Sequence, residues 1–278
     1  MNVLLTGASG MLAPAFLNKQ PRGWKLHAAN RETLDICDPV AVQECVRAFR
    51  PILILNCAAF TRVDDCEVEV ARAQAVNGAG PRHLAEAAKA VGAKLVHFSS
   101  DYVFDGTQDR PYDEADTAHP LSVYGASKWE GECHVRNTLD DHLILRTQWL
   151  YGKGGRHFVE AILHRADRNE ALRVVNDQIG SPTWTEDLSE ATLALIDAGA
   201  RGTYHLVAAG HCSWYDFACQ ILREAGRDVA ITPCTTAEFP RPARRPARGV
   251  LSTAKAKGVL GRALPAWDVA LRRFMRSV

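Results

Sequence analysis

The sequence carries almost no net charge, no long hydrophobic run and no paired cysteine motif. Lys and Arg number 33 against 32 Asp and Glu, so the formal net charge is only +1. A chain with so little charge has no field for wrapping nucleic acid or coating an anionic membrane, and we expect neither partner. The longest apolar stretch, residues 52–60, is interrupted by Asn56 and is far shorter than the roughly 20 residues that span a bilayer. Any anion that the protein binds must therefore be held by a local site.

The eight cysteines contain no CxxC pair and no cluster with histidines at the spacing of a zinc site. We therefore expect reduced thiols that are mostly buried as small hydrophobic side chains. The chain begins Met-Asn-Val-Leu-Leu-Thr-Gly, without the basic, apolar and small-residue order of a signal peptide. Together these features predict a cytoplasmic protein.

Hydrophobic residues make up 47% and charged residues 23% of the 278 residues, as in an ordinary globular protein. Short β-rich runs alternate with longer helical patterns, which predicts an α/β fold with a doubly wound parallel sheet of the Rossmann type. The predicted strands are residues 2–6, 25–29, 52–56, 94–99 and 143–147. The predicted crossover helices are residues 40–49, capped by Asp38-Pro39, and residues 68–91 and 123–137.

After about residue 150 the alternation loosens. We predict a dinucleotide-binding domain over residues 1–150, and over residues 151–278 a smaller, mainly substrate-binding lobe with some elements returning to the first domain. Four arginines and three prolines within residues 240–248 predict an extended loop. The elements expected in this half are strands at 173–175 and 203–207 and helices near 157–168, 185–197, 214–225 and 265–276.

A glycine-rich loop directly follows the first predicted strand. Gly7, Gly10 and Ala13 match the GxxGxxA form of a dinucleotide-binding loop. Gly7 permits the tight turn, Gly10 lets backbone N–H groups approach a pyrophosphate, and Ala13 allows a helix to pack closely on the strand. A glycine turn without a ligand is the alternative. Asn30 and Arg31 follow the second predicted strand, and arginine there can pair with a ribose 2′-phosphate. Arg31 therefore favours NADPH over NADH, unless it is a solvated loop residue.

Tyr124 and Lys128 stand four residues apart and so share one helix face. A nearby cation lowers the pKa of a phenol, which would make Tyr124 a workable general acid. Ser100 follows the fourth predicted strand, at the edge where doubly wound sheets bind ligands. Its hydroxyl can hydrogen-bond a carbonyl oxygen that gains negative charge as hydride arrives. The alternatives are surface helix residues that share this spacing by chance, and a strand-end turn whose hydroxyls satisfy one another.

Seven segments occur in a fixed order along nearly the whole chain. Three of them are specific: Asp-Tyr-Val-Phe-Asp-Gly at 101–106, Arg-Thr-x-Trp at 146–149 and Asp-Gln-x-Gly-x-Pro-Thr at 177–183. In these segments the chain resembles the dTDP-4-dehydrorhamnose reductase family of the extended short-chain dehydrogenase/reductase superfamily. The full set of segments is 7–13, 56–61, 99–106, 124–128, 146–152, 176–183 and 241–253.

The resemblance implies reduction of the C4 ketone of dTDP-4-dehydro-L-rhamnose to dTDP-L-rhamnose, with NADPH as cofactor and NADH as the alternative. By the resemblance, Tyr124 is the proton donor, and Lys128 binds the nicotinamide ribose and tunes Tyr124. Ser100 stands where the family usually carries threonine. Serine keeps the hydroxyl and loses the methyl group that restrains its rotamer.

The resemblance also implies contacts for further residues. At the sugar it places Ser100, Asp101 and Trp149, although Trp149 could equally be an ordinary core tryptophan. From residues 240–248 we take Arg241 as the candidate for the substrate diphosphate, with a solvated loop as the alternative. The residues expected at the cofactor are Gly7, Gly10, Met11, Leu12, Arg31, Asp35, Ile36, Ala58, Ala59, Thr61, Tyr124 and Lys128.

Two rival functions use the same motifs. One is another nucleotide-sugar reductase, an epimerase or a dehydratase, although a dehydratase would place a second acid where Tyr102 follows Asp101. The other is a non-catalytic NADP-binding regulatory subunit that resembles the beta subunit of methionine adenosyltransferase; the intact Ser100, Tyr124 and Lys128 favour an enzyme. Some members of the family use a metal at a dimer contact, but residues 13–16 offer no carboxylate ligand. We expect no metal, and a monomer or homodimer.

Overall fold

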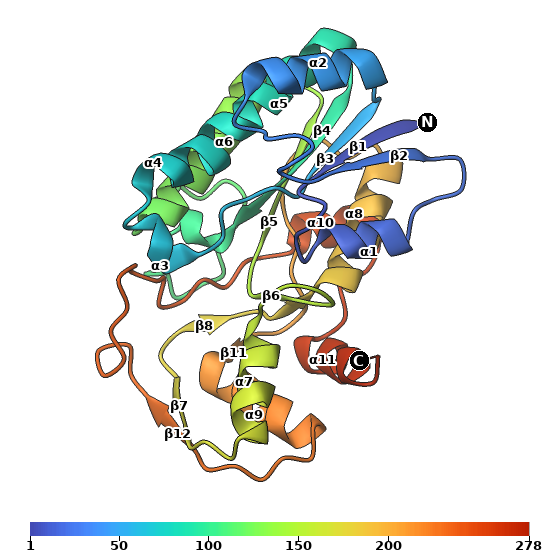
Figure 1. Cartoon of the computed structure of the whole chain (residues 1–278). Coiled ribbons are helices and arrows are strands. Elements are labelled where there is room, and N and C mark those ends of the chain that lie inside the picture. The colour runs from blue at the N-terminus through green and yellow to red at the C-terminus, as the bar shows by residue number, and fades with distance from the viewer. Residues whose placement is uncertain (278) are drawn as a thin grey trace.

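A six-stranded parallel sheet forms the centre of the computed structural model, which describes residues 1–277 (Figure 1). All neighbouring strands run parallel, so the predicted doubly wound sheet is confirmed. The chain order reverses between β1 and β3, and the carboxyl ends of those strands are where such sheets hold their ligands. In spatial order the strands are β2 (Lys25–Ala29), β1 (Asn2–Thr6), β3 (Leu53–Asn56), β4 (Lys94–Ser100), β5 (His142–Thr147) and β10 (Gly202–His205).

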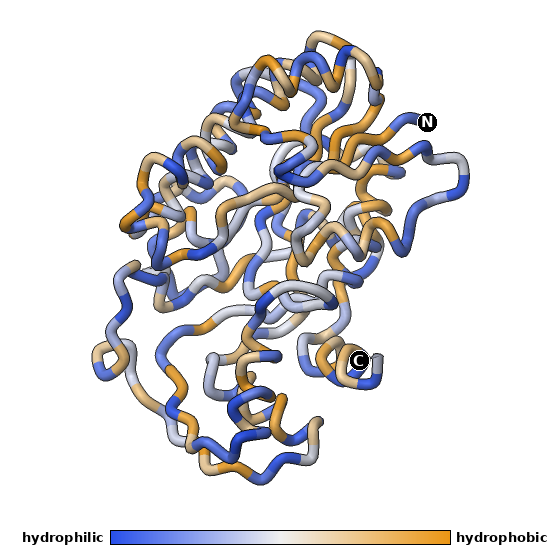
Figure 2. Tube along the Cα trace, viewed as in Figure 1, coloured by the Kyte–Doolittle hydropathy of each residue, from blue (hydrophilic) through white to orange (hydrophobic). Residues whose placement is uncertain are grey.

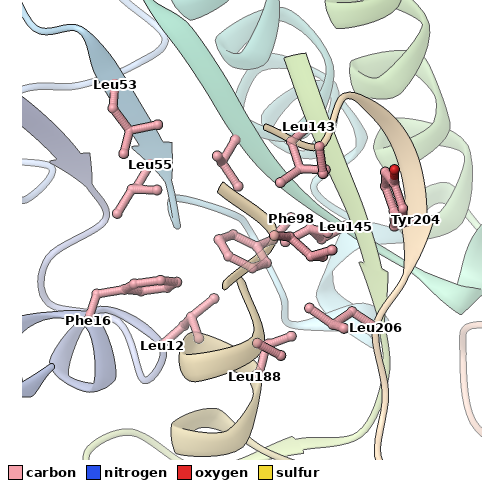
Figure 3. Packing of buried hydrophobic residues seen from close by; sticks show 14 of the residues in the cluster. Leu12, Phe16, Leu53, Leu55, Phe98, Leu143, Leu145, Leu188, Tyr204 and Leu206 are labelled. Carbon is pink, nitrogen blue, oxygen red and sulfur yellow. The ribbon is translucent and has the colours of Figure 1, made fainter. Parts of the chain in front are cut away.

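Alternate residues of the strands feed two separate hydrophobic cores, one on each face of the sheet. On β1, Leu4 packs toward one layer of helices, whereas Val3 and Leu5 pack toward the other. Figure 3 shows the second core, where Phe16 and Leu188 meet the strands. The first layer consists of α2 (Pro39–Phe49), α5 (Gly80–Val91) and α6 (Val123–Thr138). The second consists of α1 (Ala13–Asn18), α8 (Thr185–Asp197) and α10 (Ala254–Leu260).

The predicted bounds of the first five strands of the sheet hold to within one residue, whereas the strand predicted over 203–207 corresponds to β10 and ends two residues earlier. At the centre of the sheet, β1 and β3 are hydrophobic along most of their length (Figure 2). The cap predicted at Asp38 is also present, because its side chain accepts hydrogen bonds from the N–H groups of Val40 and Ala41. No helix within residues 1–277 is long and apolar enough to cross a membrane.

The helix predicted over residues 68–91 is interrupted. The structure instead has α3 (Val63–Cys66), α4 (Val70–Ala73) and a π-helical segment, η1 (Gln74–Ala79), before α5. Pro81 has no N–H, so the Asn77 carbonyl lacks its usual helical donor, and a wider turn accommodates the loss. The Asn77 side chain holds this segment in place, since it bonds to the backbone of Phe60 and to the Ser127 hydroxyl.

The second half of the chain builds a region below the sheet from short strand pairs and three helices (Figure 1). Its strand β10 returns to the main sheet; the domain division at residue 150 remains a prediction. The pairs are β6 (Leu150–Tyr151) with β9 (Thr183–Trp184), β8 (Ile179–Gly180) with β11 (Cys212–Ser213), and β7 (Leu172–Val175) with β12 (Ile231–Cys234). The helices are α7 (Phe158–Asp167), α9 (Trp214–Glu224) and α11 (Trp267–Met275).

All eight cysteines are free thiols, as expected. Their burial is lower than predicted, because only Cys66, Cys212 and Cys234 are buried and the other five are half-buried.

Candidate active site

Two adjoining cavities open at the carboxyl ends of the sheet strands. The catalytic cavity has a volume of about 370 Å³, and the smaller cavity beside it about 180 Å³. They share Gly10, Cys57 and Ala59 as lining residues. Of the residues predicted for the site, all except Arg241 line one or both cavities. These are Gly7, Gly10, Met11, Leu12, Arg31, Asp35, Ile36, Ala58, Ala59, Thr61, Ser100, Asp101, Tyr124, Lys128 and Trp149.

The glycine-rich loop joins the two cavities. Gly7 has a φ of +71°, and a Cβ there would lie 2.6 Å from the backbone nitrogen of Ala58, so only glycine fits. The Gly10 N–H donates to the Gly7 carbonyl at 2.9 Å and closes the turn. Helix α1 begins only at Ala13, so the backbone of residues 7–12 forms an open loop against the cavities.

Tyr124 and Lys128 project from the first turns of α6 into the catalytic cavity. This helix is N-capped by Ser122, whose hydroxyl accepts a hydrogen bond from the Gly125 N–H. Gly125 allows the helix to approach the loop after β4, since a Cβ there would meet the Tyr102 carbonyl. The Lys128 ammonium is 2% exposed and donates to the Phe98 carbonyl at 2.6 Å.

Burial sets the protonation of both groups. It raises the pKa of Tyr124 far above its usual value, against an opposing hydrogen bond with the Ser100 hydroxyl. It also lowers the pKa of Lys128 to about 8, which the charge of Glu132 opposes. The net shift of the Tyr124 pKa is thus upward and is caused mainly by burial, whereas the sequence predicted a lowering by Lys128.

Ser100 and Asp101 lie together at the end of β4. The Ser100 hydroxyl donates to Oδ1 of Asp101 at 2.9 Å and also accepts the Tyr102 N–H at 3.2 Å. Asp101 is 3% exposed, and burial raises its pKa to about 7, although the bond from Ser100 opposes this. The carboxyl therefore changes its protonation state near neutral pH, directly beside the hydroxyl that faces the cavity.

Trp149 forms an aromatic wall of the catalytic cavity together with Trp214, the first residue of α9. The two indoles stack with centroids 3.6 Å apart at 11°, so Trp214 covers one face of Trp149. Trp149 has a φ of +50°, a left-handed conformation that is costly for a bulky side chain. Gly180 makes room for the ring, because a Cβ there would lie 2.6 Å from Cε2 of Trp149.

Arg241 lies away from the lining of both cavities. Its guanidinium donates to Asp64 from Nε at 3.0 Å and from Nη2 at 2.6 Å, and its side chain is 51% exposed. Arg245 donates to the same carboxylate at 3.0 Å. These three bonds fasten the arginine-rich loop, residues 240–248, to α3. The contact of Arg241 with a substrate diphosphate remains a prediction.

The smaller cavity holds two arginines. Arg31 faces Asp35, with Nε 3.4 Å from Oδ2, and is 70% exposed. Arg72 was not predicted; it packs over the Phe60 ring with its guanidinium carbon 4.5 Å from the centroid. Nothing in the sequence distinguished Arg72 from a solvated helix residue. The catalytic cavity likewise includes residues that sequence reasoning missed, namely Thr147, Gln148, Arg156 and Trp214.

The RmlD substrate binding domain model matches residues 1–278. The chain belongs to this family. A dTDP-4-dehydrorhamnose reductase of Streptomyces griseus is 43% identical to this RmlD family member over 96% of this chain and 91% of its own length. The spore coat polysaccharide biosynthesis protein SpsK of Bacillus subtilis is 40% identical over 99% of this chain and 97% of its own.

A solved structure is also similar to this RmlD family member. The dTDP-4-dehydrorhamnose reductase of Bacillus anthracis, solved in complex with NADP, superposes with a TM-score of 0.97. It is 38% identical, and the match covers 100% of this chain and 99% of that one. The family resemblance inferred from the motifs is thereby confirmed.

Proposed function

We propose that the protein reduces the C4 ketone of dTDP-4-dehydro-L-rhamnose to dTDP-L-rhamnose with NADPH. One observation carries the proposal: the Ser100 hydroxyl, the Tyr124 phenol and the Lys128 ammonium line one cavity that adjoins a glycine-rich loop. This arrangement suits hydride reduction of a carbonyl, since it offers two hydroxyl donors and a cation where an alkoxide develops. The reductases that resemble the chain over nearly their whole length support the choice of substrate.

The residues of the smaller cavity fit a dinucleotide. The loop at Gly7 and Gly10 exposes backbone to a phosphate-sized space, and Arg31 and Arg72 supply two cations for a ribose phosphate. In the proposal Asp35 and Ile36 lie at the adenosine, and the backbone of residues 58–61 lies along the cofactor. When bound, the reduced nicotinamide supplies the hydride.

The side chains then divide the remaining work. Tyr124 keeps its proton at neutral pH because of its high pKa, so it can donate that proton to the new alkoxide. Ser100 turns its hydroxyl toward the ketone oxygen and fixes its position. Lys128, positive below a pH of about 8, stabilises the negative charge that forms at the oxygen and on the phenolate. Trp149 and Asp101 hold the sugar.

The composition of the cavity disfavours a dehydratase. Asp101 is the only carboxylate among the described residues that line the catalytic cavity, and the position after it is Tyr102. Elimination of water needs a second acid or base, which this wall does not offer. A regulatory subunit would not need the three catalytic side chains, so their presence supports an enzyme.

The remaining assignments complete the proposal. Residues 1–150 form the dinucleotide-binding domain, and residues 151–278 mainly form the substrate lobe. The protein works in the cytoplasm as a monomer or homodimer, with a nucleotide sugar as its substrate and without nucleic acid.

An absorbance assay tests the function. The protein is mixed with NADPH and dTDP-4-dehydro-L-rhamnose, and loss of the reduced cofactor is followed. We expect one NADPH consumed for each sugar reduced, and none with dTDP-glucose, which has a hydroxyl in place of the ketone at C4. If no NADPH is consumed at saturating substrate, the proposal is wrong and a binding subunit becomes the better explanation.

A further inference from the structure

A fully buried ion pair lies behind the catalytic cavity. Glu132 of α6 and Arg146 of β5 have side chains that are 0% and 1% exposed. The Arg146 guanidinium donates hydrogen bonds to both carboxylate oxygens of Glu132, from Nε at 2.9 Å and from Nη2 at 2.8 Å. The rings of Phe104 and Trp129 flank it, with centroids 5.0 and 5.7 Å from the guanidinium carbon. Two charges are thus held in a place where water cannot reach them, which is costly unless both remain paired.

The Glu132 carboxylate joins the elements that carry the catalytic side chains. The Ser99 hydroxyl donates to its Oε1 at 2.6 Å, which ties it to the end of β4 beside Ser100. Arg146 precedes Thr147, which lines the cavity from β5. Glu132 itself follows Tyr124 and Lys128 on α6 at intervals of eight and four residues. One carboxylate therefore connects α6 to the carboxyl ends of both β4 and β5.

Glu132 also sets the electrostatic surroundings of Lys128, which lies one helical turn before it. The groups near Lys128 from other elements are His97 on β4 and Asp101 after it, while Arg146 of β5 lies behind Glu132. Burial lowers the pKa of His97 far below its usual range, so this imidazole is neutral. His205 of β10, 3.3 Å from Arg146, is neutral for the same reason, with its pKa lowered to about 3. The pair Glu132–Arg146 has no net charge. Arg136, one turn after Glu132 on α6, adds a second cation 3.7 Å from the same carboxylate.

We propose that Glu132 is a positioning residue of the active site, which locks α6 onto the ends of β4 and β5 and holds the Lys128 ammonium in its protonated form. A well-packed apolar pair would stabilise the fold as well as this ion pair does. What an apolar pair cannot supply is a negative charge one turn from Lys128. The inference rests on the proposed reduction, in which Lys128 assists Tyr124.

The pH dependence of two quantities tests this role: the turnover rate, and the affinity for NADPH measured by its fluorescence. Glu132→Gln keeps the shape and the acceptor for Ser99 but removes the negative charge and leaves the positive charge of Arg146 without its counter-ion. We call the fall of each profile at high pH its alkaline limb. We expect this fall to occur at a pH about one unit or more lower than in the wild type. The double variant Glu132→Gln with Arg146→Gln has the same net charge there as the wild type, and its alkaline limb should return toward that of the wild type. A purely structural role predicts no such return.

A second ion pair, in which the carboxylate is buried and the arginine is half-exposed, provides a control away from the cavity. Asp187 is 6% exposed and pairs with Arg273 at 2.9 Å, and neither contributes to the lining of the catalytic cavity. Asp187→Asn removes a buried negative charge elsewhere in the fold and should leave the alkaline limb unmoved. If Glu132→Gln does not fold, Arg146→Gln decides, since removal of this cation beside Glu132 should move the limb to higher pH.

An unmoved limb in Glu132→Gln, or an equal shift in the single and double variants, would overturn the inference. An unmoved limb in Arg146→Gln would do the same if only that variant folds. If the wild type binds NADPH with the expected pH dependence but does not reduce the sugar, the proposed function fails while the role of Glu132 stands.

Discussion

The two walls of the catalytic cavity differ in chemistry and in origin. The sheet wall, defined by Ser100, Tyr124 and Lys128, is polar and comes from β4 and α6. The aromatic wall, defined by Trp149 and Trp214, comes from the segments after β5 and β11. The first contains the groups that can move a proton, and the second contains only surfaces that a ring can contact. We therefore expect damage to the sheet wall to lower turnover, and damage to the aromatic wall to lower affinity.

The largest effect on turnover is expected for Tyr124→Phe. Loss of the proton donor should lower kcat by about a hundredfold or more, with NADPH affinity nearly unchanged, because one hydroxyl and little contact area are lost. Tyr151→Phe is the matched control: the Tyr151 hydroxyl is buried without a hydrogen-bond partner in the described structure, so its removal should leave kcat unchanged and the melting temperature equal or higher. Wild-type turnover in Tyr124→Phe would remove this residue from the mechanism.

Asp101→Asn should change stability in a pH-dependent way. The carboxyl has a pKa of about 7 in the folded protein against 3.8 for the ordinary group, so the folded state binds the proton more tightly. Stability from this residue is present at low pH and is lost as the pH rises from about 4 to 7. The amide avoids that loss. We expect the free energy of unfolding of the variant at pH 8 to exceed that of the wild type by on the order of 2 to 4 kcal/mol.

Urea unfolding of this variant and the wild type at pH 4 and pH 8 gives the comparison. Equal stability differences at the two pH values would contradict the raised pKa of Asp101. A loss of stability at pH 8 would show instead that the ionised carboxylate is well solvated or paired.

The aromatic wall should respond through affinity. Trp149→Ala should raise KM for the sugar nucleotide about tenfold, a typical cost for the loss of an aromatic contact. It should raise KM for NADPH much less, because the smaller cavity does not include this ring. Trp214→Ala, which uncovers one face of Trp149, should have the smaller effect on the sugar. Equal damage to both substrates, together with a lower melting temperature, would make Trp149 an ordinary core residue.

The smallest effect is expected for Arg241→Ala. Its pairing with Asp64 is half-exposed, and such pairs contribute roughly 0 to 1 kcal/mol. If Arg241 also meets the substrate diphosphate, the variant should bind the sugar nucleotide a few-fold more weakly at low salt, and the defect should shrink as salt rises. Arg168→Ala, another exposed paired arginine, should show no such defect. Unchanged affinity in Arg241→Ala at low salt would show that Arg241 does not contact the substrate and that the arginine-rich loop is a solvated loop.

The contrast between the walls also shows what a sequence can predict. The strands and α6 follow from local hydropathy and spacing, so Tyr124, Lys128 and Ser100 were placed on their elements without a structure. The stack of Trp149 on Trp214 joins residues 65 positions apart through strand pairs only two residues long. Periodicity needs longer segments than these to be recognised. The pairs of Glu132 with Arg146 and of Arg241 with Asp64 depend on tertiary contacts, which residue spacing alone does not define.

Transfer of labelled hydride tests the central claim most directly. NADPH carrying deuterium at C4 of the nicotinamide, on the side that is transferred, is supplied with dTDP-4-dehydro-L-rhamnose, and the product is examined by NMR. The account predicts dTDP-L-rhamnose with one deuterium at C4 of the sugar, formed by the wild type and lost with Tyr124→Phe. Deuterium at another carbon, or a changed sugar without deuterium, would contradict reduction of the C4 ketone by this site.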